Sequence, residues 1–160
     1  MQSLTISRVI IFIFLSFILT ACGSGDEVTV NPNDPVEPEP SKLTLSSANG
    51  LEATLDEGNF IFNAPSSAIS SDVELTYEKT LLDETNIQQN IISDLHALTP
   101  STLTLEKPIT ITIKIPDDYA LGGQLFIAKL SGANWDTVTN SIVLDGFVSA
   151  QVTTLGTYAI

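Results

Sequence analysis

Residues 99–116 read TPSTLTLEKPITITIKIP, and the second half of this stretch places an isoleucine at every second position: Ile109, Ile111, Ile113 and Ile115. Threonines and Lys114 fill the alternate positions, so one side of the segment is apolar and the other polar. Such period-two alternation is typical of a β-strand that buries one face. Because proline has no N–H to donate, we expect Pro108 and Pro116 to bound this strand.

Shorter alternating segments lie on both sides of this strand, separated by turn signals at intervals of about 8 to 12 residues, as in sandwich folds. Asp145 and Gly146 predict a two-residue hairpin turn, and Asn49 and Gly50 predict another between residues 43–46 and 51–55. Residues 80–93 approach helical spacing but have a polar middle, so we expect a loop with one helical turn. The sequence predicts an all-β fold, a single antiparallel β-sandwich over residues 42–160.

The aromatic residues and the only histidine are assigned from their neighbours. We expect Trp135 to be buried because an aromatic residue after a turn in a small sandwich usually belongs to the core. The same interpretation applies to the phenylalanines Phe60, Phe62, Phe126 and Phe147. His96 falls in a short apolar segment, where we expect a surface or capped residue rather than a catalytic one.

Composition limits the classes of partner. The chain has 160 residues, which suits one ordinary domain, and 19 acidic residues against 6 basic ones give a net charge of −13. Such a surface repels phosphate backbones, which argues against a nucleic-acid partner, and it also argues against attachment to anionic lipid through basic residues.

The first 21 residues resemble a bacterial lipoprotein signal peptide. Arg8 precedes an apolar run, VIIFIFLSFIL at 9–19, which is shorter than the roughly 20 residues of a membrane span. Residues 19–22, LTAC, are similar to a lipobox, which implies that Cys22 becomes a lipidated N-terminus. The open alternative is an ordinary signal peptide with an incidental cysteine. Because Gly23 follows where an aspartate would favour inner-membrane retention, we expect a lipid-anchored protein of the cell envelope at the outer membrane.

Residues 22–41 comprise this cysteine and an acidic linker with four prolines and almost no residue to bury. Proline-rich chains favour the extended polyproline conformation at about 3.1 Å per residue, so a linker of this length spans up to roughly 60 Å. We predict a disordered tether that holds the folded domain away from the membrane.

Several short motifs together resemble the ZU-five domain, the β-sandwich module of ankyrins, netrin receptors and tight-junction scaffolds. They are GNFIFNAPSSAI at 58–69, the Lys107–Pro108 pair before the isoleucine strand, Gly132 with Trp135, and the closing run from Thr154 through Tyr158 to Ile160. This resemblance implies a sandwich that serves as an interaction module. Some relatives cleave themselves at a His-Phe-Ser site, but residues 154–156 are Thr-Leu-Gly, so we do not expect self-cleavage.

Catalytic and metal-binding motifs are weak. One histidine, no Gly-x-Ser-x-Gly elbow and one cysteine argue against a serine hydrolase and against zinc, and we expect no enzyme and no cofactor beyond the lipid on Cys22. We expect a non-catalytic module that binds an envelope protein. The alternative is a glycan- or calcium-binding lipoprotein that uses the acidic loops and the tryptophan, with candidate residues Asp117, Asp118, Trp135 and Asp136.

Overall fold

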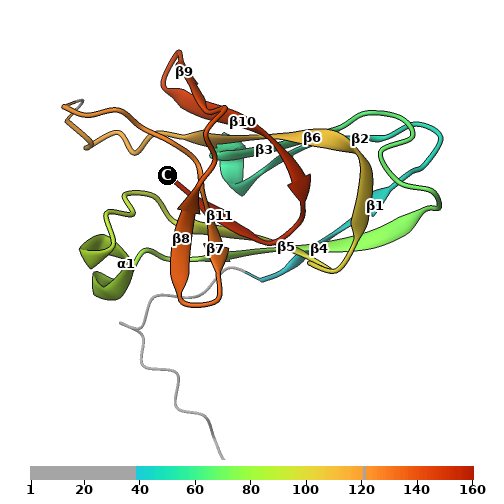
Figure 1. The fold of residues 1–160 in the computed structure, drawn as a ribbon, viewed down its shortest axis with the longest axis horizontal. Coiled ribbons are helices and arrows are strands. Elements are labelled where there is room, and N and C mark those ends of the chain that lie inside the picture. The colour runs from blue at the N-terminus through green and yellow to red at the C-terminus, as the bar shows by residue number, and fades with distance from the viewer. Residues whose placement is uncertain (1–38, 121) are drawn as a thin grey trace, which may run out of the picture. The chain divides into compact units, whose positions relative to one another are not determined.

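The computed structural model describes residues 39–120 and 122–160, which form two packed antiparallel sheets (Figure 1). The first sheet contains, in spatial order, β1 (Ser41–Leu45), β4 (Val73–Thr80), β5 (Leu95–Thr99), β11 (Thr157–Ala159), β7 (Ala128–Ser131) and β8 (Asn134–Thr137). The second contains β2 (Leu51–Leu55), β3 (Phe60–Ala64), β6 (Thr104–Lys114), β10 (Phe147–Thr154) and β9 (Ile142–Leu144). The predicted all-β sandwich is confirmed.

Two short helical segments complete the described part of the chain: η1 (Asp56–Gly58) and α1 (Glu84–Gln88). The predicted single helical turn within residues 80–93 is therefore confirmed. Neither segment is long and apolar enough to cross a membrane, and the described residues hold no other helix. The predicted signal peptide, Cys22 and the linker up to residue 38 lie outside the described residues.

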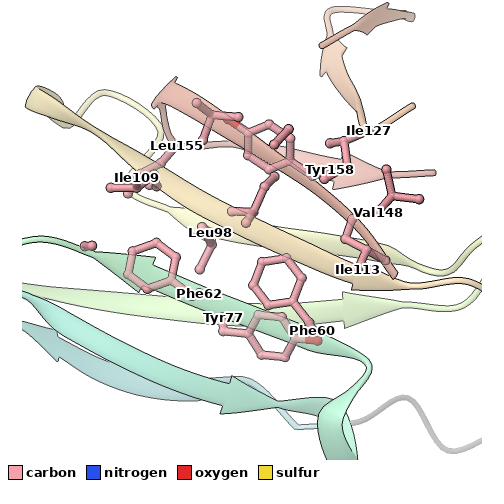
Figure 2. Packing of buried hydrophobic residues seen from close by; sticks show 14 of the residues in the cluster. Phe60, Phe62, Tyr77, Leu98, Ile109, Ile113, Ile127, Val148, Leu155 and Tyr158 are labelled. Atoms are coloured by element: carbon pink, nitrogen blue, oxygen red, sulfur yellow. The ribbon is translucent and has the colours of Figure 1, made fainter. Parts of the chain in front are cut away.

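The isoleucine strand β6 lies at the centre of the five-stranded sheet, between β3 and β10. Its isoleucines face the other sheet and are almost fully buried, whereas Thr110 and Thr112 face outward. Ile113 pairs with Phe60 on β3 and with Val148 on β10, so three strands contribute to one apolar layer (Figure 2). The predicted alternation of buried and outward residues on this strand is confirmed.

The prediction that Pro108 bounds this strand is wrong. Strand β6 begins at Thr104 and runs through Pro108 to Lys114. Its pairing with β10 is interrupted there. Val152 opposes Ile109, but Thr154, only two residues further along β10, opposes Thr104, so β6 has extra residues between these two pairs. A bulge of this kind leaves backbone groups unpaired, so a proline without an N–H fits inside the strand.

The two predicted hairpins have different outcomes. Asp145 and Gly146 both have positive φ, 50° and 83°, and connect β9 to β10 as a two-residue turn, as predicted. The hairpin at Asn49 and Gly50 is wrong, because β1 pairs with β4 and β2 pairs with β3 in the other sheet. Gly50 instead lets the chain cross between the sheets. A Cβ atom there would stand 2.2 Å from the carbonyl oxygen of Ala64.

The aromatic residues are only partly placed as predicted. Phe60 and Phe62 are fully buried, but Phe126 and Phe147 are half-buried, so their assignment to the core is wrong. In both cases the next residue along the chain, whose side chain points to the opposite side, is the buried one. These residues are Ile127, after Phe126, and Val148, after Phe147.

Candidate functional site

The predicted site residues Asp117 and Asp118 line a hollow of about 310 Å³ at one end of the sandwich. We call it the acidic hollow. Strand β6 ends at Lys114 and the loop after it carries both aspartates, while η1 and the residues before β5 form the opposite wall. The carboxylates and the imidazole that line it are those of Asp56, Asp94, Asp117, Asp118 and His96.

A lysine bridges two of these carboxylates. The Nζ atom of Lys79 lies 2.9 Å from Asp56 Oδ1 and 3.1 Å from Asp94 Oδ2, and only 16% of its side chain is exposed. Burial acts to lower the pKa of Lys79, but the hydrogen bonds that its ammonium donates to both carboxylates, together with their negative charges, outweigh it, so the pKa is raised above its ordinary value. Lys79 therefore carries a charged ammonium group at this end of the sandwich although most of its side chain is buried.

His96 lies on the floor of the acidic hollow and is 2% exposed. Its Nδ1 atom is 2.9 Å from the Tyr77 hydroxyl, and its ring stacks on Phe60 with centroids 4.8 Å apart. Burial lowers the pKa of His96 to about 4, and it raises the pKa of Tyr77. The imidazole is therefore neutral at pH 7. Of the two expected states, surface or capped, the structure shows the second, because the ring is buried in the core and its Nδ1 is capped by the Tyr77 hydroxyl.

The second nitrogen of this ring is available. No hydrogen bond within the described residues reaches His96 Nε2, yet no buried side-chain nitrogen or oxygen among those residues lacks a partner. Nδ1 holds the orientation of the ring, and because His96 lines the hollow, Nε2 is the ring nitrogen left for a ligand bound there.

The other two predicted site residues lie elsewhere. Trp135 is half-buried on the outer face of the six-stranded sheet, where it packs against a small apolar cluster, and its Nε1 lies 3.3 Å from Asn86 Oδ1 of α1. It lines a second hollow of about 510 Å³ with a mixed polar and apolar lining, to which Ile91 and Tyr119 also contribute. Asp136 is exposed and lines neither hollow. The structure brings Asp117 and Asp118 together and leaves the tryptophan and Asp136 apart from them.

Metal binding was part of the predicted alternative. In residues 39–120 and 122–160, no three His, Cys, Asp or Glu side chains are arranged to hold a metal ion. Asp117 is already occupied, because both of its carboxylate oxygens lie 2.9 Å from Lys114 Nζ.

Sequence reasoning missed Lys79 and Asp94 as parts of this site. A signal for Lys79 was present, since alternation along β4 places it on the same inward side as Leu75 and Tyr77. In the register of β4 and β5, Lys79 opposes His96. No sequence pattern indicates that the loops carrying Asp56 and Asp94 meet around it.

A second candidate surface lies at the β9 edge of the five-stranded sheet. Ile142, Val143 and Leu144 are 65%, 46% and 67% exposed. Leu144 opposes Phe147 and Ile142 opposes Ser149, so Ile142 and Leu144 share the outer face of the sheet. We call Ile142, Val143, Leu144 and Phe147 the β9 edge surface. It is an apolar patch on a chain whose net charge is −13.

The fold defines a class, a small antiparallel β-sandwich module. Residues 48–160 match the family model of the Zu5-like domain, and the chain belongs to this family. None of the curated proteins matches the chain.

The structure explains why two of the quoted motifs occur together. Lys107 Nζ donates to the Ser66 carbonyl at 2.8 Å, and the Glu106 N–H donates to the Ala68 carbonyl at the same distance. The Lys-Pro element therefore fastens the Ala-Pro-Ser-Ser-Ala loop.

Proposed function

We propose that this chain is a lipid-anchored protein of the cell envelope whose Zu5-like domain binds a partner protein through the β9 edge surface. The observation that carries the proposal is the exposure of three consecutive aliphatic residues on an edge strand. Soluble proteins usually protect such edges with charges, because unpaired backbone groups invite a further strand. A partner strand added here gains both backbone hydrogen bonds and apolar contacts.

The other three sheet edges support this choice. The edge strands β1, β2 and β8 carry Lys42, Glu52 and Asp136, whereas β9 has no charged residue. In the hairpin register, the backbone N–H and C=O groups of Ile142 and Leu144 point toward β10. The backbone groups of Val143 therefore point away from the sheet, to the free side of β9. The free edge is short, and we expect a transient interaction whose affinity depends on the flanking apolar side chains.

The predicted lipobox supports the anchoring part of the proposal. Lipidation at Cys22 adds about 0.8 kcal/mol of membrane affinity per buried methylene, and more than one acyl chain gives stable attachment. The acidic linker then acts as a spacer, which lets the domain reach a partner at some distance from the outer membrane.

Site-specific cross-linking tests the binding surface. A photoactivatable residue at Leu144 should give a cross-linked product in intact cells, while the same residue at Thr54, on the opposite edge of the same sheet, should not. Adding Val143→Lys to the Leu144 probe should remove the product, because an ammonium group on the edge repels an added strand. Equal cross-linking from Leu144 and Thr54 would refute the assignment.

Intact-mass spectrometry tests the anchor. The purified chain should begin at Cys22 and carry the mass of a diacylglycerol with or without a further acyl chain, and Cys22→Ser should abolish this modification and release the domain from the membrane fraction. An unmodified Cys22, or an N-terminus elsewhere, would refute the lipoprotein proposal.

A ligand-binding function is the second candidate, and the acidic hollow is the observation that favours it. Asp117 and Asp118 meet a buried imidazole there, so a glycan or calcium would involve these two residues rather than Trp135 or Asp136. A rise in melting temperature with calcium or sugar, lost in Asp118→Asn, would support it.

A further inference from the structure

We infer that the acidic hollow binds an alkylammonium group, and that its occupant is a lysine side chain of a partner protein. The inference rests on the proposed function only in taking the partner to be a protein. It concerns a different end of the domain from the β9 edge surface.

The first argument is charge. Four carboxylates line the hollow, those of Asp56, Asp94, Asp117 and Asp118, and two lysines lie at it, Lys79 and Lys114. The hollow therefore retains an excess of negative charge, which attracts a cation and repels an anion. Asp118 forms no ion pair with the described residues, so its carboxylate is the acceptor open to an incoming ammonium.

The second argument is the lysine that the protein already holds there. Lys79 keeps its ammonium between Asp56 and Asp94 although most of its side chain is buried. An ammonium group is thus stabilised at this end of the sandwich when two carboxylates face it. A second ammonium in the hollow would likewise meet a carboxylate, that of Asp118.

The third argument is His96, which makes the hollow more than a group of acidic residues. Its ring is almost completely buried and lines the hollow, and Nε2 has no hydrogen bond among the described residues. The Tyr77 hydroxyl can accept from Nδ1–H, which leaves a lone pair on Nε2. In that tautomer the neutral ring accepts an N–H from the ligand and adds no positive charge to oppose it.

Size also restricts the occupant. A volume of about 310 Å³ is at the lower limit of small-molecule sites, so it suits one side chain rather than an oligosaccharide or a peptide segment.

The test uses the fact that His96 is the only histidine of the chain, so its imidazole nitrogens give unambiguous NMR signals. The full chain in a non-ionic detergent at pH 7 is titrated with Nα-acetyl-lysine methylamide. The matched ligand is Nα-acetyl-norleucine methylamide, which has the same aliphatic chain without the ammonium. We expect a saturable shift of Nε2 with the lysine compound and none with the norleucine compound.

Two variants locate the interaction. Asp118→Asn should weaken the lysine compound about threefold, since one partly exposed carboxylate is lost, and Asp136→Asn on the exposed strand β8 should leave it unchanged. Calcium and methyl glucoside are titrated in the same way. The inference is wrong if the norleucine compound shifts the Nε2 signal as much as the lysine compound does, or if the two variants bind the lysine compound equally well. It is also wrong if calcium or methyl glucoside shifts the signal and the lysine compound does not. Because the titration needs neither Cys22 nor β9, its failure is distinguishable from failure of the proposed function.

Discussion

Replacing Ile111 by alanine tests whether the isoleucine face of β6 is the centre of the core. Ile111 is 0% exposed and is paired with Phe62 on one side and Ala150 on the other. The substitution removes three carbon atoms, which costs about 2.4 kcal/mol at 0.8 kcal/mol for each buried methylene. The cavity left between the two sheets adds to this, so we expect a loss of about 3 kcal/mol in the free energy of unfolding.

The assay is urea unfolding followed by far-ultraviolet circular dichroism. With a slope of about 2 kcal/mol per molar urea, the midpoint should fall by about 1.5 M. The control is Thr112→Ala, one position along the same strand, which removes only the outward hydrogen bond to Ser149 and should cost about 0.5 to 1 kcal/mol. If the two variants lose equal stability, the assignment of the buried face is wrong.

Two further predictions concern His96 and Gly50. Because the folded-state pKa of His96 is about 4 and the unfolded value is 6.5, the unfolded chain binds more protons between these values, so stability falls as pH drops through this window. Between pH 7 and pH 5, the free energy of unfolding of the wild-type chain, measured with urea, should fall by about 2 kcal/mol more than that of His96→Gln. An equal fall in the two proteins would contradict this. Gly50→Ala should cost more than about 3 kcal/mol, because the new Cβ would meet backbone atoms at 2.2 to 2.9 Å. Gly132→Ala, with positive φ but open space, should cost about 1 kcal/mol in the same assay, and similar losses would refute the steric argument.

The fold was predictable from the sequence where local rules decide it. The alternation of β6 and the Asp145–Gly146 turn depend on neighbouring residues, and both appear as predicted. The partner of β1 depends on a residue far along the chain, since Leu45 pairs with Val73 rather than with the segment after Gly50. A turn signal describes only the turn itself, so it could not distinguish a hairpin from a crossing between the sheets.

The candidate site was less predictable, for a related reason. Asp117 and Asp118 were selected because they lie in a loop, and they do line a hollow. Trp135 was assigned to the core by its place after a turn, yet it lies on the outer face of the six-stranded sheet, where it packs against a small apolar cluster and donates to Asn86 of α1. The sequence gives no direct indication that a residue 49 positions earlier makes this contact.

The distribution of charge on the domain indicates how partners approach it. On the outer face of the five-stranded sheet, the strand registers place Thr112 and Ser149 near the β9 edge surface, and Lys114 opposes Phe147. Strand β10, which pairs with β9, carries no charged residue. The net charge of −13 is therefore carried by other parts of the chain, the acidic hollow among them. A partner with an uncharged β-edge would meet little electrostatic repulsion at β9, whereas a basic partner would be attracted to the hollow. Raising the salt concentration should consequently weaken lysine binding at the hollow and leave cross-linking from Leu144 nearly unchanged, and the opposite dependence would show that the two surfaces have been assigned the wrong chemistry.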